Sequence, residues 1–250
     1  MVLTGRDWTP PDGVEHALVE LTAYDGSHTH HWRRAYDGVL CVAPIHLAAP
    51  LMAFLPEPDG LRAVFLSSNN AALLDVSADY EAIRAGESAV QGGPLDAVIL
   101  QPTAICGRPG DPVLSHMADR IGDGRAVWLP GARTRQWPVD FRDVADAMIH
   151  ALRPDVPAGT YGLGGPQGLS YAALAREVEC ALWQPAVLRD VPAPAARALG
   201  KLLPRGREGA ALRRAGVDRV AVSTPMPGFA PRRGIADMLL GLTTADRLPS

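Results

Sequence analysis

The sequence predicts one soluble α/β domain in which helices cover both faces of a parallel β-sheet. Short apolar runs alternate along the chain with longer stretches of helical periodicity, which is the order that builds βαβ units rather than a β-sandwich. The run Val39–Ala43 is apolar on both faces of a strand, as a sheet buried between two helical layers requires. A chain of 250 residues is long enough for one such core with a small C-terminal elaboration.

In the first half of the chain, expected strands alternate with expected helices. The apolar runs that we interpret as strands are Met1–Thr4, His16–Leu21, Gly38–Ala43, Arg62–Leu66 and Ala97–Gln101. The stretches with helical periodicity are Ser27–Ala35, Ile45–Phe54 and Tyr80–Gln91. This alternation places the carboxyl ends of the parallel strands at one edge of the sheet, which is where ligands bind in such folds.

The second half predicts a different mixture of elements. Helices are expected at Pro112–Gly122, at Phe141–Leu152 and from Ser170 to about Leu182, and short strands at Ala126–Trp128 and Gly159–Leu163. Either Asp140 or Asp143 can serve at the N-terminus of the second helix, and Ser170 is the expected N-cap of the third. From Pro185 the chain is rich in Pro, Ala and Arg, and we expect helices and loops that cap one end of the sheet, about residues 185–230.

Composition excludes several classes of function. A formal net charge of −3 provides no broad positive surface for nucleic acid, and the basic stretch Lys201–Arg219 is interpreted as a solvated face. No apolar run is long enough to span a membrane, and no signal peptide is visible. The three cysteines lack the spacing of a disulfide scaffold or a zinc site. We therefore expect a cytoplasmic protein without a metal that binds a small molecule.

The residues after the strand Arg62–Leu66 carry the most promising chemistry. Ser67 and Ser68 follow that strand directly, so they lie at the edge where ligands are expected. Tyr80 and Arg84 are one helical turn apart and share a face of the next helix. A cation near a tyrosine favours the phenolate, which can then exchange protons with a carbinol or carbonyl. The sequence therefore predicts a proton-transfer site at Ser67, Ser68, Tyr80 and Arg84.

This arrangement resembles the Ser…Tyr-x-x-x-Lys set of the short-chain dehydrogenase/reductases, in their extended or atypical branch of NAD-dependent epimerases and dehydratases. Arg84 stands where that family has lysine. Further segments resemble the family in the same order along the chain: Leu95–Gly107, Pro138–Ala151, Gly159–Ala175 and Gly228–Pro231. Within the first of them, Gln101 replaces the family's arginine and Cys106 its tyrosine. The resemblance implies a Rossmann-like doubly wound parallel sheet, shortened at its N-terminus, with a small C-terminal substrate cap.

The resemblance also implies a function and a cofactor site. The implied activity is that of an NAD(P)-dependent reductase, epimerase or dehydratase acting on a small carbonyl or sugar-type substrate. Tyr80 would be the general acid/base, Ser67 or Ser68 would orient the reacting oxygen, and Arg84 would lower the pKa of the tyrosine. The positions implied for cofactor binding are Arg6, Ala43, Pro44, Pro102 and Thr103. Relatives often dimerise through paired helices, which correspond here to Ile45–Phe54 and Tyr80–Gln91.

The family's opening strand and Gly-x-x-Gly-x-x-Gly loop have no counterpart before Gly38. Two alignments of the first residues with the family are possible. In one, Val2–Asp7 is the family's second strand, and Arg6 is placed to neutralise the 2′-phosphate of an adenosine. In the other, Val2–Gly5 is the family's first strand, and the helix and strand that follow it in the family are missing. Trp8–Gly13 is too short for a crossover helix between parallel strands.

The alternative function is that of a degenerate or cofactor-independent relative that senses a ligand or associates with another protein.

Overall fold

The computed structural model describes residues 2–4, 16–18, 37–48, 60–72, 78–203 and 207–245. Its centre is a four-stranded parallel sheet with the strand order β10-β5-β4-β3. The strands are β3 (Val39–Cys41), β4 (Arg62–Leu66), β5 (Asp96–Pro102) and β10 (Gly159–Leu163). The α/β class and the parallel sheet that the sequence predicts are therefore confirmed.

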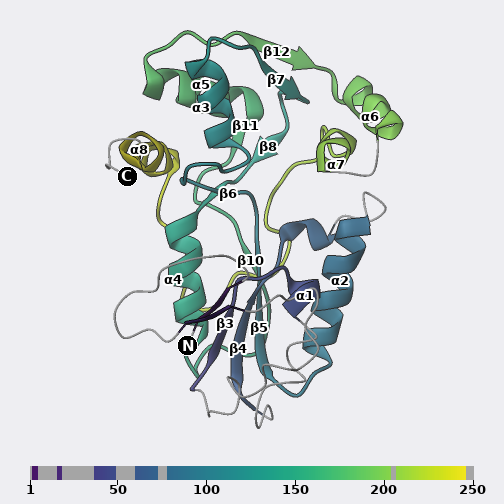
Figure 1. Cartoon of the computed structure of the whole chain (residues 1–250), viewed down its shortest axis with the longest axis vertical. Helices are drawn as coiled ribbons and strands as arrows, with labels where there is room; N and C mark the ends of the chain where they lie inside the picture. The colour runs from purple at the N-terminus through teal and green to yellow at the C-terminus, as the bar shows by residue number, and fades with distance from the viewer. Residues whose placement is uncertain are drawn as a thin grey trace.

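Alternate residues of the central strands pack on opposite faces of the sheet. One face carries Val64, Val98 and Leu100, which pack against the helix α4 (Phe141–Ala151). The other face carries Ala63, Phe65 and Ile99, which pack against α1 (Ile45–Ala48) and α2 (Ala78–Gln91). Figure 1 shows α4 and α2 on opposite sides of the sheet. The sheet is therefore covered on both faces, which explains why Ala63–Leu66 and Ala97–Leu100 are uninterrupted apolar runs.

A second core lies beyond the carboxyl ends of the strands, in the upper part of Figure 1. It contains α3 (Leu114–Gly122), α5 (Tyr171–Leu182), α8 (Ile235–Ala245) and the parallel pair β7 (Val127–Pro130) and β12 (Leu188–Val191). The helices α6 (Ala193–Leu202) and α7 (Arg207–Arg213) pack on one another beside it.

Two small strand pairs lie between the central sheet and this second core. One is the parallel pair β6 (Ile105–Cys106) and β9 (Val139–Asp140), and the other is the antiparallel pair β8 (Arg135–Gln136) and β11 (Leu169–Ser170).

The two N-caps expected from the sequence are present. The side chain of Asp140 accepts a hydrogen bond from the backbone N–H of Arg142 at the start of α4, and that of Ser170 accepts one from Ala173 at the start of α5. Each satisfies a backbone donor that the helix itself leaves unpaired. Asp140, and not Asp143, is therefore the cap of α4.

Most expected elements are observed to within a few residues. The strand β12 is a correction, because the region after Pro185 was expected to contain only helices and loops. The expected helix Ser27–Ala35 and the part of Ile45–Phe54 beyond Ala48 lie outside the described residues. The single-domain organisation and the pairing of subunits through α1 and α2 stay predictions.

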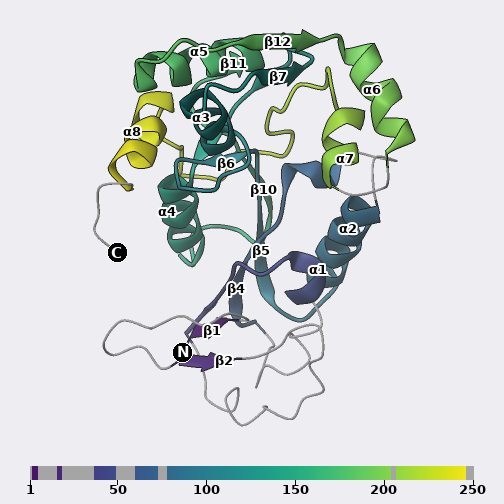
Figure 2. The same cartoon turned by 45° about the horizontal axis from the view of Figure 1, so that its top comes forward.

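At the N-terminus, β1 (Val2–Thr4) pairs in parallel with β2 (His16–Leu18) as a two-stranded sheet of their own. Figure 2 shows this pair at the end of the molecule away from α5 and β12. Among the described residues, neither strand pairs with the central sheet. Both registers considered for the first residues had placed Val2 in that sheet, which is not what is observed. No helix in the described ranges is long and apolar enough to cross a membrane.

Candidate active site

The carboxyl ends of the central strands meet at one edge, as the parallel register requires. Cys41 lies opposite Phe65, and Leu66 lies opposite Leu100. The residues that follow β3 and β4 are therefore level with Gln101 and the end of β5. Because β5 continues directly into β6, this edge faces the second core (Figure 1).

Ser67 belongs to a chain of four hydrogen-bonded side chains at this edge. Its hydroxyl donates to the carboxylate of Glu87, on α2. The amide of Gln101 donates to both oxygens of the same carboxylate, at 2.8 and 2.9 Å, and accepts from the hydroxyl of Ser223. Glu87 and Gln101 are buried. The hydroxyl hydrogen of Ser67 is therefore directed to Glu87 and away from a ligand.

Ser68 lies at the start of the turn that leads from β4 into the next element of the chain. Its hydroxyl accepts a hydrogen bond from the backbone N–H of Asn70 at 3.2 Å, at the beginning of the 3-10 helix η4 (Asn69–Ala72). The Asn69 side chain donates to the carbonyl of Val220 at 2.9 Å. The turn after Ser68 therefore holds a distant segment of the chain against the edge of the sheet.

Tyr80 lies in the first turn of α2 with only 7% of its surface exposed. Its phenol oxygen accepts a hydrogen bond from the guanidinium of Arg214, which also donates to the side-chain oxygen of Asn70 at 2.9 Å. Burial raises the pKa of Tyr80, and the positive charges of Arg214 and Arg219 offset only part of that effect. Tyr80 is therefore protonated at neutral pH.

Arg84 is placed differently from the expectation. Its guanidinium reaches the carbonyl of Ala71 in η4, at 3.4 Å, while the cation in contact with Tyr80 is Arg214. Ser68 and Arg84 both contact the 3-10 helix η4, and Tyr80 is linked to it through Arg214 and Asn70. Ser67 instead contacts Glu87. Arg214 belongs to the basic stretch that the sequence led us to interpret as a solvated face, and for this half-buried residue that interpretation was wrong.

The residues implied for cofactor binding are distributed along the same edge. Ala43 and Pro44 follow β3, and Pro44 is exposed. Pro102 is buried opposite Leu163 of β10, and the hydroxyl of Thr103 donates to the backbone carbonyl of Trp137. Arg6 lies outside the described residues.

A hollow of about 500 Å³ lies between α3, β7 and the segment 211–219, and we call it the α3–β7 hollow. Gln136, Arg214 and Arg219 contribute to its lining, together with the aromatic side chains of Tyr171 and Trp128. Gln136 is 1% exposed, and neither its amide nitrogen nor its amide oxygen has a hydrogen-bond partner within the described part of the chain. Because a buried polar group without a partner costs free energy, a polar group that reached this amide would be bound favourably.

The α3–β7 hollow has an excess of positive charge on one side. Burial and the neighbouring charge of Arg219 lower the pKa of Arg214 to about 10, so Arg214 stays charged at neutral pH. The guanidinium of Arg219 lies over the ring of Tyr171, 6.0 Å from its centroid. Among the described residues, neither arginine forms an ion pair with a carboxylate. The α3–β7 hollow is therefore suited to an anionic ligand.

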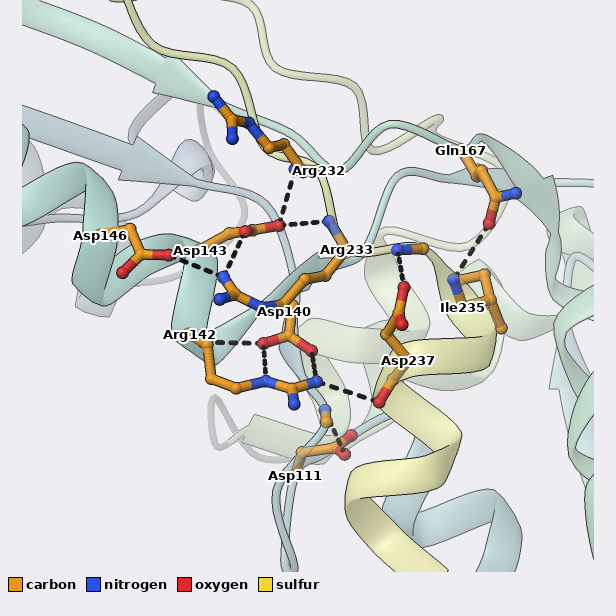
Figure 3. A network of polar contacts seen from close by, with 12 residues as sticks. Asp111, Asp140, Arg142, Asp143, Asp146, Gln167, Arg232, Arg233, Ile235 and Asp237 are labelled. Atoms are coloured by element: carbon orange, nitrogen blue, oxygen red, sulfur yellow. Dashed lines mark hydrogen bonds and ion pairs between the residues drawn. The ribbon is translucent and has the colours of Figure 1, made fainter.

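A polar network on the other side of the second core has a structural role (Figure 3). The carboxylate of Asp143 accepts hydrogen bonds from the backbone N–H groups of Arg232 and Arg233, at 3.0 and 2.8 Å, and pairs with the Arg233 guanidinium. The guanidinium of Arg142 pairs with Asp140 and reaches the carbonyl of Asp237 in α8. These contacts fasten α4 to the segment leading into α8.

Comparison with known proteins supports the fold. No family model matches the chain, and no curated protein matches it by sequence. The Bordetella bronchiseptica enzyme WbmG, solved with NAD and UDP, superposes with a TM-score of 0.65 at 14% identity, covering 95% of this chain and 82% of WbmG. The fold is that of the NAD-dependent epimerases and dehydratases.

Two epimerases agree with this result. UDP-N-acetylglucosamine 4-epimerase from Bacillus cereus has a TM-score of 0.65 at 11% identity, over 99% of this chain and 88% of its own. UDP-glucose 4-epimerase from Thermus thermophilus, in complex with NAD, has a TM-score of 0.63 at 18% identity, over 95% of this chain and 86% of its own. The predicted resemblance to the NAD-dependent epimerases and dehydratases is therefore confirmed at the level of the fold.

Proposed function

We propose that the protein is an NAD(P)-linked epimerase, dehydratase or reductase whose substrate is a sugar carried on a nucleoside diphosphate. One observation carries the proposal. The amide of Gln136 and the guanidinium groups of Arg214 and Arg219, which have no hydrogen-bond partner and no carboxylate partner respectively among the described residues, line one hollow, and Arg214 connects that hollow to Tyr80. An amide suits the polar edge of a base or sugar, and arginines suit phosphate oxygens.

The described residues at the carboxyl ends of the strands fit the nicotinamide part of the cofactor. Ala43 and Pro44 have no side-chain hydrogen-bonding groups, and a flat ring can approach the sheet over such residues, whereas Pro102 is buried beneath this edge. Ser68 carries a hydroxyl at the same edge, and that of Thr103 donates to the backbone carbonyl of Trp137. The chemistry that NAD(P) supplies when bound is the acceptance and return of a hydride at a carbon that bears oxygen.

Tyr80 supplies the proton in this proposal. Because the Arg214 guanidinium donates to the phenol oxygen, the phenol hydrogen is left for an oxygen of the substrate. Burial keeps that hydrogen on Tyr80 at neutral pH, so the group begins the cycle as an acid. Ser68, rather than Ser67, orients the reacting oxygen, because the hydroxyl of Ser67 is directed to Glu87. Arg84 steadies the turn through the Ala71 carbonyl.

The ligands and substrates of the similar proteins support the same class of ligand. WbmG was solved with NAD and UDP, and the two epimerases are named for UDP-linked sugars. A module that only senses a ligand or associates with another protein is not favoured. Such a module does not require a buried phenol, that of Tyr80, in contact with the guanidinium of Arg214.

The test is to titrate the purified protein with NADH and NADPH, and then to follow UDP-glucose and UDP-N-acetylglucosamine with NAD⁺ by proton NMR. We expect cofactor binding and a slow change at the sugar ring, with Tyr80→Phe binding the cofactor but leaving the sugar unchanged. A protein that binds neither cofactor at millimolar concentration would refute the proposal.

A further inference from the structure

We propose that Arg214 is a shared cation: it binds an anionic group of the ligand in the α3–β7 hollow and, at the same time, controls the proton of Tyr80. The inference deepens the proposed function and rests on it for the role of Tyr80 in turnover. The anionic chemistry in question is that of a diphosphate.

The two sides of the Arg214 guanidinium have different surroundings. Its Nη1 donates to Asn70 and to the phenol of Tyr80, and its carbon lies 5.5 Å from the centroid of the Tyr80 ring. Its Nε is buried and has no hydrogen-bond partner in the described ranges, although the residue lines the α3–β7 hollow. One donor is therefore left for a ligand while another is in use at Tyr80.

A second residue at the same hollow independently indicates a ligand. Gln136 is almost completely buried, and its whole amide lacks a partner within the described residues. The backbone of Gln136 forms a bridge with that of Arg219, which brings the amide and the second guanidinium to the same wall. A group that accepts from the arginines and also pairs with an amide satisfies these atoms together.

The charges that face Tyr80 come from several elements. Arg214, Arg219 and Arg213 each lower the pKa of Tyr80, and Asp79 raises it, while burial has the largest effect and raises it. The pKa of Arg214 is lowered by burial and by the charge of Arg219, and Tyr80 and Tyr171 raise it. Arg214 is thus the strongest of the charges that favour ionisation of Tyr80.

The remaining charged groups of the α3–β7 hollow do not neutralise the arginines. His116 and Asp119 are exposed on α3. The carboxylate of Asp111 is occupied by the backbone N–H groups that open α3, including those of Val113 and Leu114 at 2.9 and 2.7 Å. An anion in the α3–β7 hollow therefore meets the positive charge of Arg214 directly.

The consequence is a coupling between ligand binding and the proton of Tyr80. An anion that neutralises Arg214 removes the charge that favours the phenolate, so the pKa of Tyr80 rises when the anion binds. By reciprocity, ionisation of Tyr80 weakens the binding of the anion by the same factor. A diphosphate ligand thus secures the proton that Tyr80 donates.

The first arm of the test measures binding without NAD. Inorganic pyrophosphate and UDP are titrated calorimetrically into the wild type, Arg214→Gln, Arg214→Lys and Arg189→Gln, the last a control on the exposed part of β12. We expect affinity to fall about tenfold or more in Arg214→Gln, corresponding to loss of a charged hydrogen bond, and less in Arg214→Lys. Unchanged affinity in a folded Arg214→Gln overturns the proposal. Binding of UDP but not pyrophosphate identifies the nucleotide as part of the ligand and supports it.

The second arm measures the titration of Tyr80 by near-ultraviolet absorbance, with Tyr80→Phe identifying its contribution among the 5 tyrosines. We expect saturating UDP to move this titration to higher pH in the wild type but not in Arg214→Gln. An unchanged titration in the wild type overturns the proposal, even if Arg214→Gln does not fold. Because neither arm requires NAD or turnover, failure of the proposed enzymatic activity is distinguishable from failure of this coupling.

Discussion

The guanidinium of Arg214 donates a hydrogen bond to the phenol oxygen of Tyr80, although 134 residues separate the two in the chain. The cation of this site therefore comes from the segment after α7 and not from the helix that carries the tyrosine. A site built this way exists only when the second core is packed against the edge of the central sheet.

The first prediction concerns the proton of Tyr80. Tyr80→Phe removes the hydroxyl while keeping the buried ring, so we expect turnover of the sugar substrate to fall by about 10² to 10⁴, as loss of a general acid does. Cofactor affinity should stay within about twofold, because the ring still fills its place. Steady-state kinetics and cofactor titration check this, and full turnover in Tyr80→Phe would show that another group donates the proton.

The second prediction concerns the pH dependence of activity. The pKa of Tyr80 is raised by burial, and Arg214 opposes that effect. In Arg214→Gln the opposing charge is lost, so we expect the alkaline limb of the pH profile, where Tyr80 loses its proton, to move to higher pH. In Arg189→Gln the limb should not move. A shift to lower pH in Arg214→Gln would contradict the assignment of this limb to Tyr80.

The third prediction concerns the buried carboxylate of Glu87. Glu87→Ala leaves the hydroxyl of Ser67 and the amide of Gln101 without their acceptor, and we expect a loss of about 1–3 kcal/mol in the free energy of unfolding. Ser88→Ala, at the next, exposed position of α2, is the matched control and should change it by less than about 0.5 kcal/mol. Urea denaturation measures both. Equal stability of the two variants would refute a structural role for the carboxylate.

The fourth prediction concerns acid stability at the start of α4. Burial acts to raise the pKa of Asp140, but hydrogen bonds from Arg142 outweigh it, so the pKa lies below its ordinary value of 3.8. The stability that this carboxylate contributes is therefore present above the unfolded pKa and is lost as the pH falls through the folded pKa. Asp140→Asn, which keeps an N-cap but loses the charge, should show less of this acid loss when unfolding is followed from pH 7 downward. An identical acid dependence in both proteins would contradict the prediction.

The fifth prediction concerns the backbone contact between two loops. A side chain at Gly165 would place its Cβ 1.8 Å from the carbonyl oxygen of Pro138, so Gly165→Ala should destabilise the fold by about 1–3 kcal/mol or prevent folding. Gly122 has no atom within 4 Å of the corresponding point, and Gly122→Ala in α3 should be neutral or slightly stabilising. Thermal unfolding compares the two. A neutral Gly165→Ala would mean that the loops separate easily.

Local patterns were sufficient for the elements of the central sheet and for the helix starts. The apolar runs that became β4 and β10 and the cap Ser170 depend on neighbours within a few residues, so periodicity and residue type predict them. For α4, residue type narrowed the cap only to Asp140 or Asp143, and the structure decides for Asp140. The same holds for Tyr80 and Ser68, because α2 follows β4 closely in the chain and packs against the intervening helix η4.

Other features depend on partners that are distant in the chain. β12 is half-exposed and lacks the long apolar run of a buried strand, and it forms because β7 offers it a ladder. Gln136 is buried, and its backbone bridges that of Arg219, 83 residues later in the chain, which no local pattern signals.

By itself, the sequence determined the α/β class, the parallel strands and the placing of Ser68 and Tyr80 at one edge, because these follow from short-range periodicity and from the geometry of parallel sheets. Only the tertiary structure decided that Arg214, rather than Arg84, contacts the phenol, and that Ser67 faces Glu87. The physical reason is that a guanidinium on a long side chain takes the acceptor that packing brings within reach, and packing joins segments that the sequence separates.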